Sequence, residues 1–125
     1  MEIKETTTKT YIVTGAERLD PITIMLTDFE RLGHGKITIE CYGKSWTGIW
    51  GSMGTGIADF FTSCNNSYLI GKMSNERHEI QDPEWVYDGE GDYEPDMIPN
   101  PEYEYLNRII DAVKMALGKI AVQAL

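Results

Sequence analysis

The sequence predicts an α+β fold, in which a small antiparallel sheet of three or four strands packs against two helices at about 56–72 and 101–121. Apolar and polar residues alternate with a period of two up to residue 50, the period becomes helical after a glycine-rich run at 48–56, and a second helical stripe ends the chain. At 125 residues and 42% hydrophobic content, the chain is long enough for one domain, 1–125, with its own core.

Four stretches carry the strand pattern. They are TYIVTG (10–15), PITIMLTDFE (21–30), KITIECY (36–42) and SWTGIW (45–50). In the third stretch, Ile37, Ile39 and Cys41 fall on one face. RLGHG (31–35) supplies two glycines for a hairpin loop, so we expect consecutive antiparallel strands.

Two helices follow from apolar spacing. The stretch IADFFTSCNNSYLIGKM predicts one helix over about 56–72. For the second, Asn100 is a suitable N-cap and Pro101 suits the first helical position. Its apolar stripe runs from Leu106 to Ala121, and Gly118 is expected to weaken or end it.

The cysteines and histidines predict no special chemistry. Cys41 and Cys64 lie in apolar runs, which is typical of free thiols in a reducing compartment. His34 and His78 form no closely spaced ligand pair, so no metal site and no cofactor are expected. The chain has no apolar run of membrane length and no signal-peptide pattern, so a cytoplasmic protein without membrane contact is expected.

A glycine-rich turn follows the last predicted strand. GIWGSMGTG (48–56) lacks the spacing of a dinucleotide fingerprint or of a P-loop. Its glycines are expected to turn the chain and to allow close packing of the nearby tryptophans. An alternative is a small-ligand or anion site at the turn, because helix N-termini present free N–H groups. That site would consist of Trp46, Gly51, Gly54 and Gly56.

The charge is concentrated in one segment. Residues 76–104 carry eleven carboxylates and one basic side chain, Arg77, giving −10, so the remainder of a chain of net charge −9 carries +1. Phosphate backbones are bound through Lys and Arg, so direct nucleic-acid binding is not expected. A basic partner, or a divalent cation, is the better match.

Residues 76–100 are expected to form an acidic, aromatic-rich loop segment. Every second residue from Asp88 to Asp96 is a carboxylate, and an extended chain would point all five the same way at intervals of about 6.6 Å. An EF-hand beginning at Asp88 fails, because Tyr93 and Pro99 stand where its Gly and Glu are required.

The acidic and aromatic side chains of this region are expected to form a partner-binding face, because aromatic residues make tight contacts after charge has steered the encounter. The face consists of Asp82, Glu84, Trp85, Tyr87, Asp88, Glu90, Asp92, Tyr93, Glu94, Asp96, Glu102 and Tyr103. The alternative is a solvated loop. Such loops rarely carry so many large side chains.

PITIMLTDFERLGHGKITIECYGKSWTGIWGSMG, followed by ADFFTSCNNSYLIGKM, resembles a family of small, uncharacterised proteins encoded by phages and prophages of enteric bacteria. The resemblance covers about residues 20–73, and KITIECYGKSW and the WGSMG turn are its most recognisable pieces. It implies a small phage protein in a bacterial cytoplasm, where inhibitors of host defence are common. It carries over no catalytic residue.

We therefore expect a phage accessory protein that acts by binding and not as an enzyme. Its partner would be a host protein with a basic nucleic-acid-binding surface, which the acidic face would occupy as a nucleic-acid mimic, in the manner of an anti-restriction or anti-CRISPR inhibitor. Two alternatives stay open. One is a small-ligand binder or enzyme using the turn 48–56, and the other is a dimerisation module that pairs through its C-terminal helix.

Overall fold

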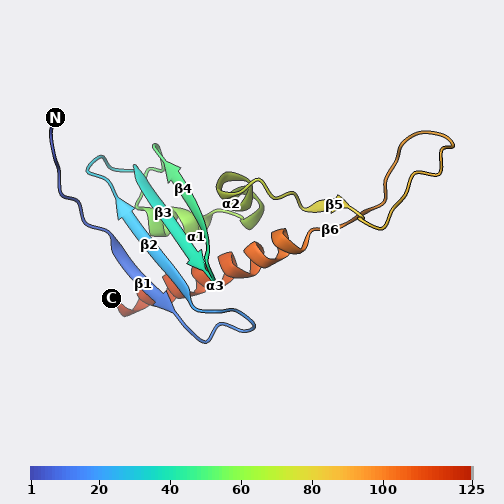
Figure 1. Ribbon diagram of the computed structural model, residues 1–125. Helices are drawn as coiled ribbons and strands as arrows, with labels where there is room; N and C mark the ends of the chain where they lie inside the picture. Colours follow the sequence, from blue (N-terminus) through green and yellow to red (C-terminus); the bar gives the residue numbers. More distant parts are fainter. Residues whose placement is uncertain (125) are drawn as a thin grey trace.

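The computed structural model describes residues 1–124, so the last residue of the predicted domain, Leu125, lies outside the described part. Strands β1 (Lys9–Val13), β2 (Ile22–Asp28), β3 (Gly35–Cys41) and β4 (Lys44–Trp50) form an antiparallel sheet in that order. Helices α1 (Ile57–Ser63), α2 (Asn66–Met73) and α3 (Pro101–Gln123) cover one face of the sheet. A hairpin of β5 (Glu79–Gln81) and β6 (Met97–Pro99) projects away from it (Figure 1). The predicted α+β class is confirmed.

All four predicted strands are present, and their alternation gives the sheet its buried face. Ile24 pairs with Ile39, and Leu26 with Ile37, so the apolar positions of β2 and β3 align on the side of the helices. Ile24, Ile37 and Ile39 are fully buried there. No helix of residues 1–124 covers the opposite face, which carries Thr23, Met25 and Thr38. This is the usual arrangement of an antiparallel sheet with one solvated side.

The hairpin between β3 and β4 turns through two residues only. Tyr42 and Gly43 both have positive φ, 49° and 77°, which a two-residue hairpin turn of the primed type requires. The Tyr42 side chain is 81% exposed.

The predicted helix at 56–72 is wrong as a single helix. The chain breaks at Cys64 and Asn65, and the Asn65 side chain accepts a hydrogen bond of 2.8 Å from the Tyr68 N–H as the N-cap of α2. The chain continues from this break as α2, in which Leu69 and Ile70 are buried. The apolar spacing alone did not reveal this break, whereas the strong N-cap preference of asparagine marks it.

Helix α3 begins as predicted and ends later. Asn100 caps it and Pro101 is its first residue. It continues through Gly118 to Gln123, so Gly118 does not end the helix. A glycine costs a helix only about 1 kcal/mol, which packing along the stripe offsets. The buried part of that stripe consists of Leu106, Ile109, Ile110, Val113 and Leu117.

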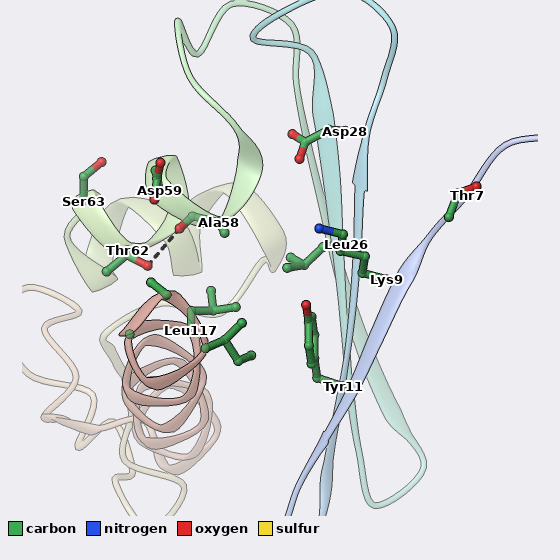
Figure 2. A pocket seen from close by; sticks show the side chains of 13 residues that line it. Thr7, Lys9, Tyr11, Leu26, Asp28, Ala58, Asp59, Thr62, Ser63 and Leu117 are labelled. Carbon is green, nitrogen blue, oxygen red and sulfur yellow. Dashed lines mark hydrogen bonds between the residues drawn. The ribbon is translucent and has the colours of Figure 1, made fainter. Parts of the chain in front are cut away.

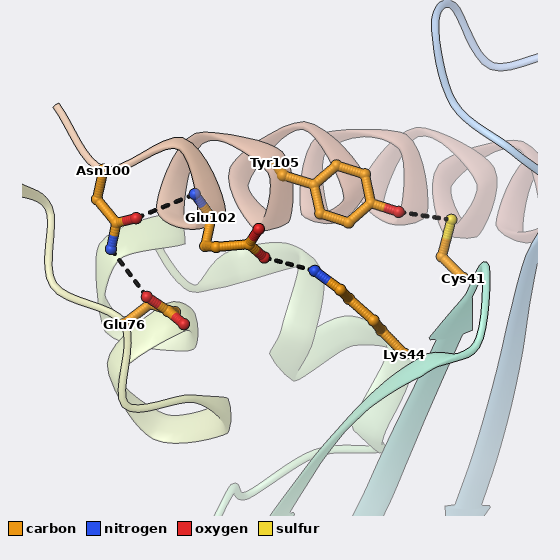
Figure 3. Close-up of polar contacts among 6 residues, drawn as sticks. All are labelled: Cys41, Lys44, Glu76, Asn100, Glu102 and Tyr105. Atoms are coloured by element: carbon orange, nitrogen blue, oxygen red, sulfur yellow. Dashed lines mark hydrogen bonds and ion pairs between the residues drawn. The ribbon is translucent and has the colours of Figure 1, made fainter.

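Both cysteines are free thiols. Cys41 is buried in the core and Cys64 is half-buried at the end of α1. The Tyr105 hydroxyl donates a hydrogen bond of 3.4 Å to the Cys41 sulfur (Figure 3). This hydrogen bond and burial raise the pKa of Tyr105 to about 12.

Candidate functional site: an acidic aromatic arm

Residues 79–99, which we call the arm, form a hairpin that extends beyond the N-terminal end of α3 (Figure 1). Its two short strands pair through Glu79 with Pro99, Ile80 with Ile98, and Gln81 with Met97. Beyond this ladder, the Asp82 N–H donates a hydrogen bond of 2.8 Å to the Asp96 carbonyl. The rest of the chain, residues 1–78 and 100–124, is called the body.

Hydrogen bonds of one buried residue, Asn100, hold the base of the arm on the body. Asn100 is 2% exposed, and its N–H donates a hydrogen bond of 3.0 Å to the His78 carbonyl, which brings both ends of the arm together. Its side-chain amide donates to the Glu76 carboxylate, and its side-chain oxygen accepts from the Glu102 N–H at 3.0 Å (Figure 3). The amide also donates to the Arg77 carbonyl. The same side chain therefore caps α3 and fixes the base of the arm.

The tip of the arm turns and does not extend as a strand. Gly89 and Gly91 have φ of 84° and 71°, and the Asp88 carboxylate accepts a hydrogen bond of 2.9 Å from the Glu90 N–H. The expected row of carboxylates at even spacing along an extended chain is therefore wrong. Glycines in the left-handed region reverse the chain direction there.

Three aromatic rings pack together in the arm. Trp85 and Tyr93 lie edge to face with ring centroids 5.0 Å apart, and the Tyr87 and Tyr93 centroids are 5.6 Å apart. The Tyr87 hydroxyl donates a hydrogen bond of 2.6 Å to the Gly91 carbonyl, which ties the cluster to the turn. Tyr93 is nevertheless 62% exposed. The arm therefore presents a preformed aromatic surface.

Exposed aliphatic side chains extend this surface. Val86 is 81% exposed and Met97 is 50% exposed. Neither residue was among the predicted binding residues. Their position beside Trp85 and Ile98, in a segment otherwise rich in acids, is the sequence signal that indicates them.

The arm carries nearly all of the net charge. Its eight carboxylates have no Lys or Arg among them, so the arm contributes −8 of the total −9 and leaves −1 on the rest of the chain. They are Glu79, Asp82, Glu84, Asp88, Glu90, Asp92, Glu94 and Asp96. Like charges at this density attract basic surfaces and repel acidic ones.

Ten of the twelve predicted partner-binding residues lie on the arm, and the other two lie on α3. The Glu102 carboxylate forms an ion pair of 2.6 Å with the Lys44 ammonium of β4 (Figure 3). Tyr103 is half-buried and packs against the core, with its ring centroid 5.0 Å from that of His78. Glu102 and Tyr103 therefore already make contacts within the body.

The glycine-rich turn lies on the body, away from the arm. The Trp46 ring lies at the edge of the Tyr105 ring, with centroids 6.2 Å apart. Gly54 has φ of 73°, and Gly51 borders open space. Gly56 precedes α1, whose first N–H, that of Ile57, donates a hydrogen bond of 2.8 Å to the Asp28 carboxylate. The protein's own carboxylate therefore takes the place that an anion would have at this helix start.

Gly48 shows the packing role that was predicted for these glycines. A Cβ atom at this position would lie 2.4 Å from the Trp50 ring, so the Trp50 side chain folds over the glycine. The Trp50 indole N–H then donates a hydrogen bond of 2.8 Å to the Tyr68 hydroxyl of α2. The glycine thus allows β4 and α2 to be joined by an aromatic pair.

Comparison with known proteins identifies the family. A model of the phage family Phage_phiTE_072 matches residues 1–89. The chain belongs to this phage family. The resemblance to phage proteins is therefore confirmed, and the match extends beyond residues 20–73 to include β1 and the first half of the arm. No curated protein and no solved structure matches significantly. Within residues 1–124, no helix is long and apolar enough to cross a membrane.

Proposed function

We propose that this phage protein acts by binding in the cytoplasm of the infected bacterium, where its arm docks on a basic, nucleic-acid-binding surface of a host defence complex and blocks it. The observation that carries the proposal is the concentration of −8 charge and three packed aromatic rings on one projecting hairpin. A projecting hairpin reaches a recessed surface that a flat sheet face does not.

Charge and shape would have separate roles in such a complex. The carboxylates would steer the arm toward Lys and Arg side chains that normally contact phosphates, since attraction between opposite charges raises association rates. Trp85 and the two tyrosines would then provide the tight contacts, because aromatic residues dominate the energetics of interfaces and also stack on arginine. Mimicry here rests on charge density and aromatic contact, because the tip turns at Gly89 and Gly91.

The competing dimerisation hypothesis has less support. The apolar stripe of α3 that suggested it is buried within the chain, against the sheet and the other helices. Met115 and Val122 are exposed on that helix, at 66% and 68%. Two separate side chains of this kind are common on the surfaces of monomers.

An affinity pull-down from lysate of the bacterial host tests the proposal. We would compare the tagged protein with a variant in which Asp88, Glu90, Asp92, Glu94 and Asp96 are replaced by their amides. Asp88→Asn retains a side-chain oxygen that accepts the hydrogen bond from the Glu90 N–H, so the turn is preserved. We expect the native chain to recover a nucleic-acid-binding complex that the variant does not recover.

A matched control removes the same charge from the body. Amides at Glu2, Glu5, Glu17, Glu30 and Glu40, all exposed side chains of the body, change the net charge equally. This control is expected to keep the partner. Recovery of one partner by all three proteins, or a purified complex whose affinity does not fall as salt is raised to physiological strength, would contradict electrostatic mimicry.

A further inference from the structure

A cavity of about 590 Å³ lies between the sheet and the helices, at the end of the molecule opposite to the arm. One wall is formed by Tyr11 of β1 and Leu26 of β2, and the other by Ala58 of α1 with Leu117 of α3 (Figure 2). Ile120 of α3 also lines the cavity. Cavities that hold small molecules commonly have about 300–1,000 Å³ and a mainly apolar lining. This cavity has the size and lining of a ligand site.

Two hydrogen-bond donors face this space from the sheet. Figure 2 shows the Lys9 ammonium and the Tyr11 hydroxyl on β1, beside the Leu26 side chain. Within residues 1–124, neither group forms an ion pair or a side-chain hydrogen bond. A positive charge and a hydroxyl that have no side-chain partner in the described part of the chain, beside an apolar wall, match a head group that only accepts hydrogen bonds.

The acidic groups of the cavity are placed differently. The Asp28 carboxylate accepts the Ile57 N–H bond of 2.8 Å at the start of α1. Asp59 is exposed in the first turn of the same helix, where the positive end of the helix dipole stabilises a carboxylate. Both acids are therefore associated with α1, whereas the Lys9 and Tyr11 donors lie on the β1 wall.

From this arrangement we propose that the cavity binds an amphipathic carboxylic acid. The carboxylate accepts hydrogen bonds from Lys9 and Tyr11, and the apolar body of the ligand packs between Leu26 and Leu117. This site is independent of the arm and of its proposed partner. It lies at the C-terminal half of α3, whereas the arm joins the N-terminal end.

Titration of the full chain with decanoate, followed by calorimetry and by the methyl NMR signals of Leu26, Leu117 and Ile120, tests this proposal. We expect saturable one-to-one binding below the micelle-forming concentration, with shifts confined to these methyl groups. Decanol and decylamine serve as probes of equal chain length that lack the carboxylate. Both are expected to bind more weakly than decanoate.

Substitutions separate the head-group contact from burial of the tail. Lys9→Met keeps an unbranched side chain of similar length but removes the ammonium group. It is expected to weaken decanoate binding by about tenfold or more, as for the loss of one charge-assisted hydrogen bond. Tyr11→Phe keeps the wall and should give a smaller loss. Lys36→Met removes the same charge from the opposite face of the sheet and should leave binding unchanged.

Three results would overturn the proposal. The first is no saturable binding of decanoate, and the second is equal or tighter binding of decylamine. The third is unchanged decanoate affinity in a Lys9→Met variant whose melting temperature equals that of the native protein. Because none of these measurements involves a host protein, failure here leaves the function of the arm unaffected.

Discussion

The body and the arm are stabilised by different interactions. In the body, Ile24, Ile39, Phe61 and Ile109 are completely buried in one apolar core. In the arm, residues 79–99, no side chain is fully buried, and order depends on a short backbone ladder, turns and contacts between aromatic rings. The body therefore has the larger share of stability, since burial of apolar surface is the dominant favourable term in folding.

Because the two regions are stabilised differently, substitutions in them are expected to change different properties of the protein. Changes in the body are expected to alter the free energy of unfolding, whereas changes in the arm are expected to alter binding with little effect on stability. Asn100 is the exception, because this body residue both caps α3 and fixes the base of the arm. The four predictions below test this division, from the largest expected effect to the smallest.

Phe61→Ala is expected to destabilise the protein by about 3–5 kcal/mol, because it removes a fully buried ring and leaves a cavity. Urea unfolding, followed by tryptophan fluorescence, measures the change. A loss below about 1 kcal/mol would contradict the description of a single well-packed core, because such a value is typical of surface positions.

Asn100→Ala is expected to cost about 1–3 kcal/mol, since it removes the cap of α3 and leaves the Arg77 carbonyl without its side-chain donor. Hydrogen exchange at the Asp82 N–H should also become faster, because the base of the arm is released. Asn75→Ala, at an exposed position before the arm, is the matched control and should change neither quantity. An effect on α3 alone would show that the arm does not depend on this residue.

Tyr105→Phe is expected to cost about 1 kcal/mol at neutral pH through loss of the hydrogen bond to Cys41. The folded pKa of Tyr105 is raised from 10.0 to about 12, so the neutral hydroxyl stabilises the fold below pH 10 and this contribution is lost as pH rises toward 12. The stability difference between the two proteins should therefore shrink over that interval. A difference that stays constant from pH 9 to 12 would contradict the raised pKa.

Trp85→Ser is expected to change the free energy of unfolding by no more than about 0.5 kcal/mol, because the two rings that Trp85 contacts, those of Tyr87 and Tyr93, both belong to the arm. The NMR signals of the Tyr87 and Tyr93 rings should nevertheless shift, and capture of a host partner should be lost. A large loss of stability would mean that the arm contributes to the core of the body.

The sequence predicted the sheet well because its signal is local. Alternation in ITIML and KITIEC determines which side of each strand is buried, and the pairing of Ile24 with Ile39 follows from it. Asn100 and Pro101 likewise marked the start of α3 to the residue. The break at Asn65 was missed because two short helices share one apolar period, and only the capping residue separates them.

The sequence predicted which residue types form the candidate site, but it did not predict the conformation of the arm that carries them. The density of carboxylates and aromatic residues is visible in the sequence, so ten of the residues expected to bind a partner do lie together on the arm. The turn at Gly89 and Gly91 was not predicted, because the alternation of acids suggested an extended chain. The cavity near Lys9 was not predicted, since it depends on how β1 and α3 meet in space.

The chain leaves the body at His78 and returns at Asn100, and a hydrogen bond of 3.0 Å joins these two residues. A segment whose two ends are neighbours can be inserted into a fold without changing the path of the chain on either side. Its length and sequence can therefore diverge while the body stays the same. Evolution of a new specificity would then require change in one hairpin only. For the same reason, the body is a natural display scaffold on which foreign hairpins could be grafted in place of the arm.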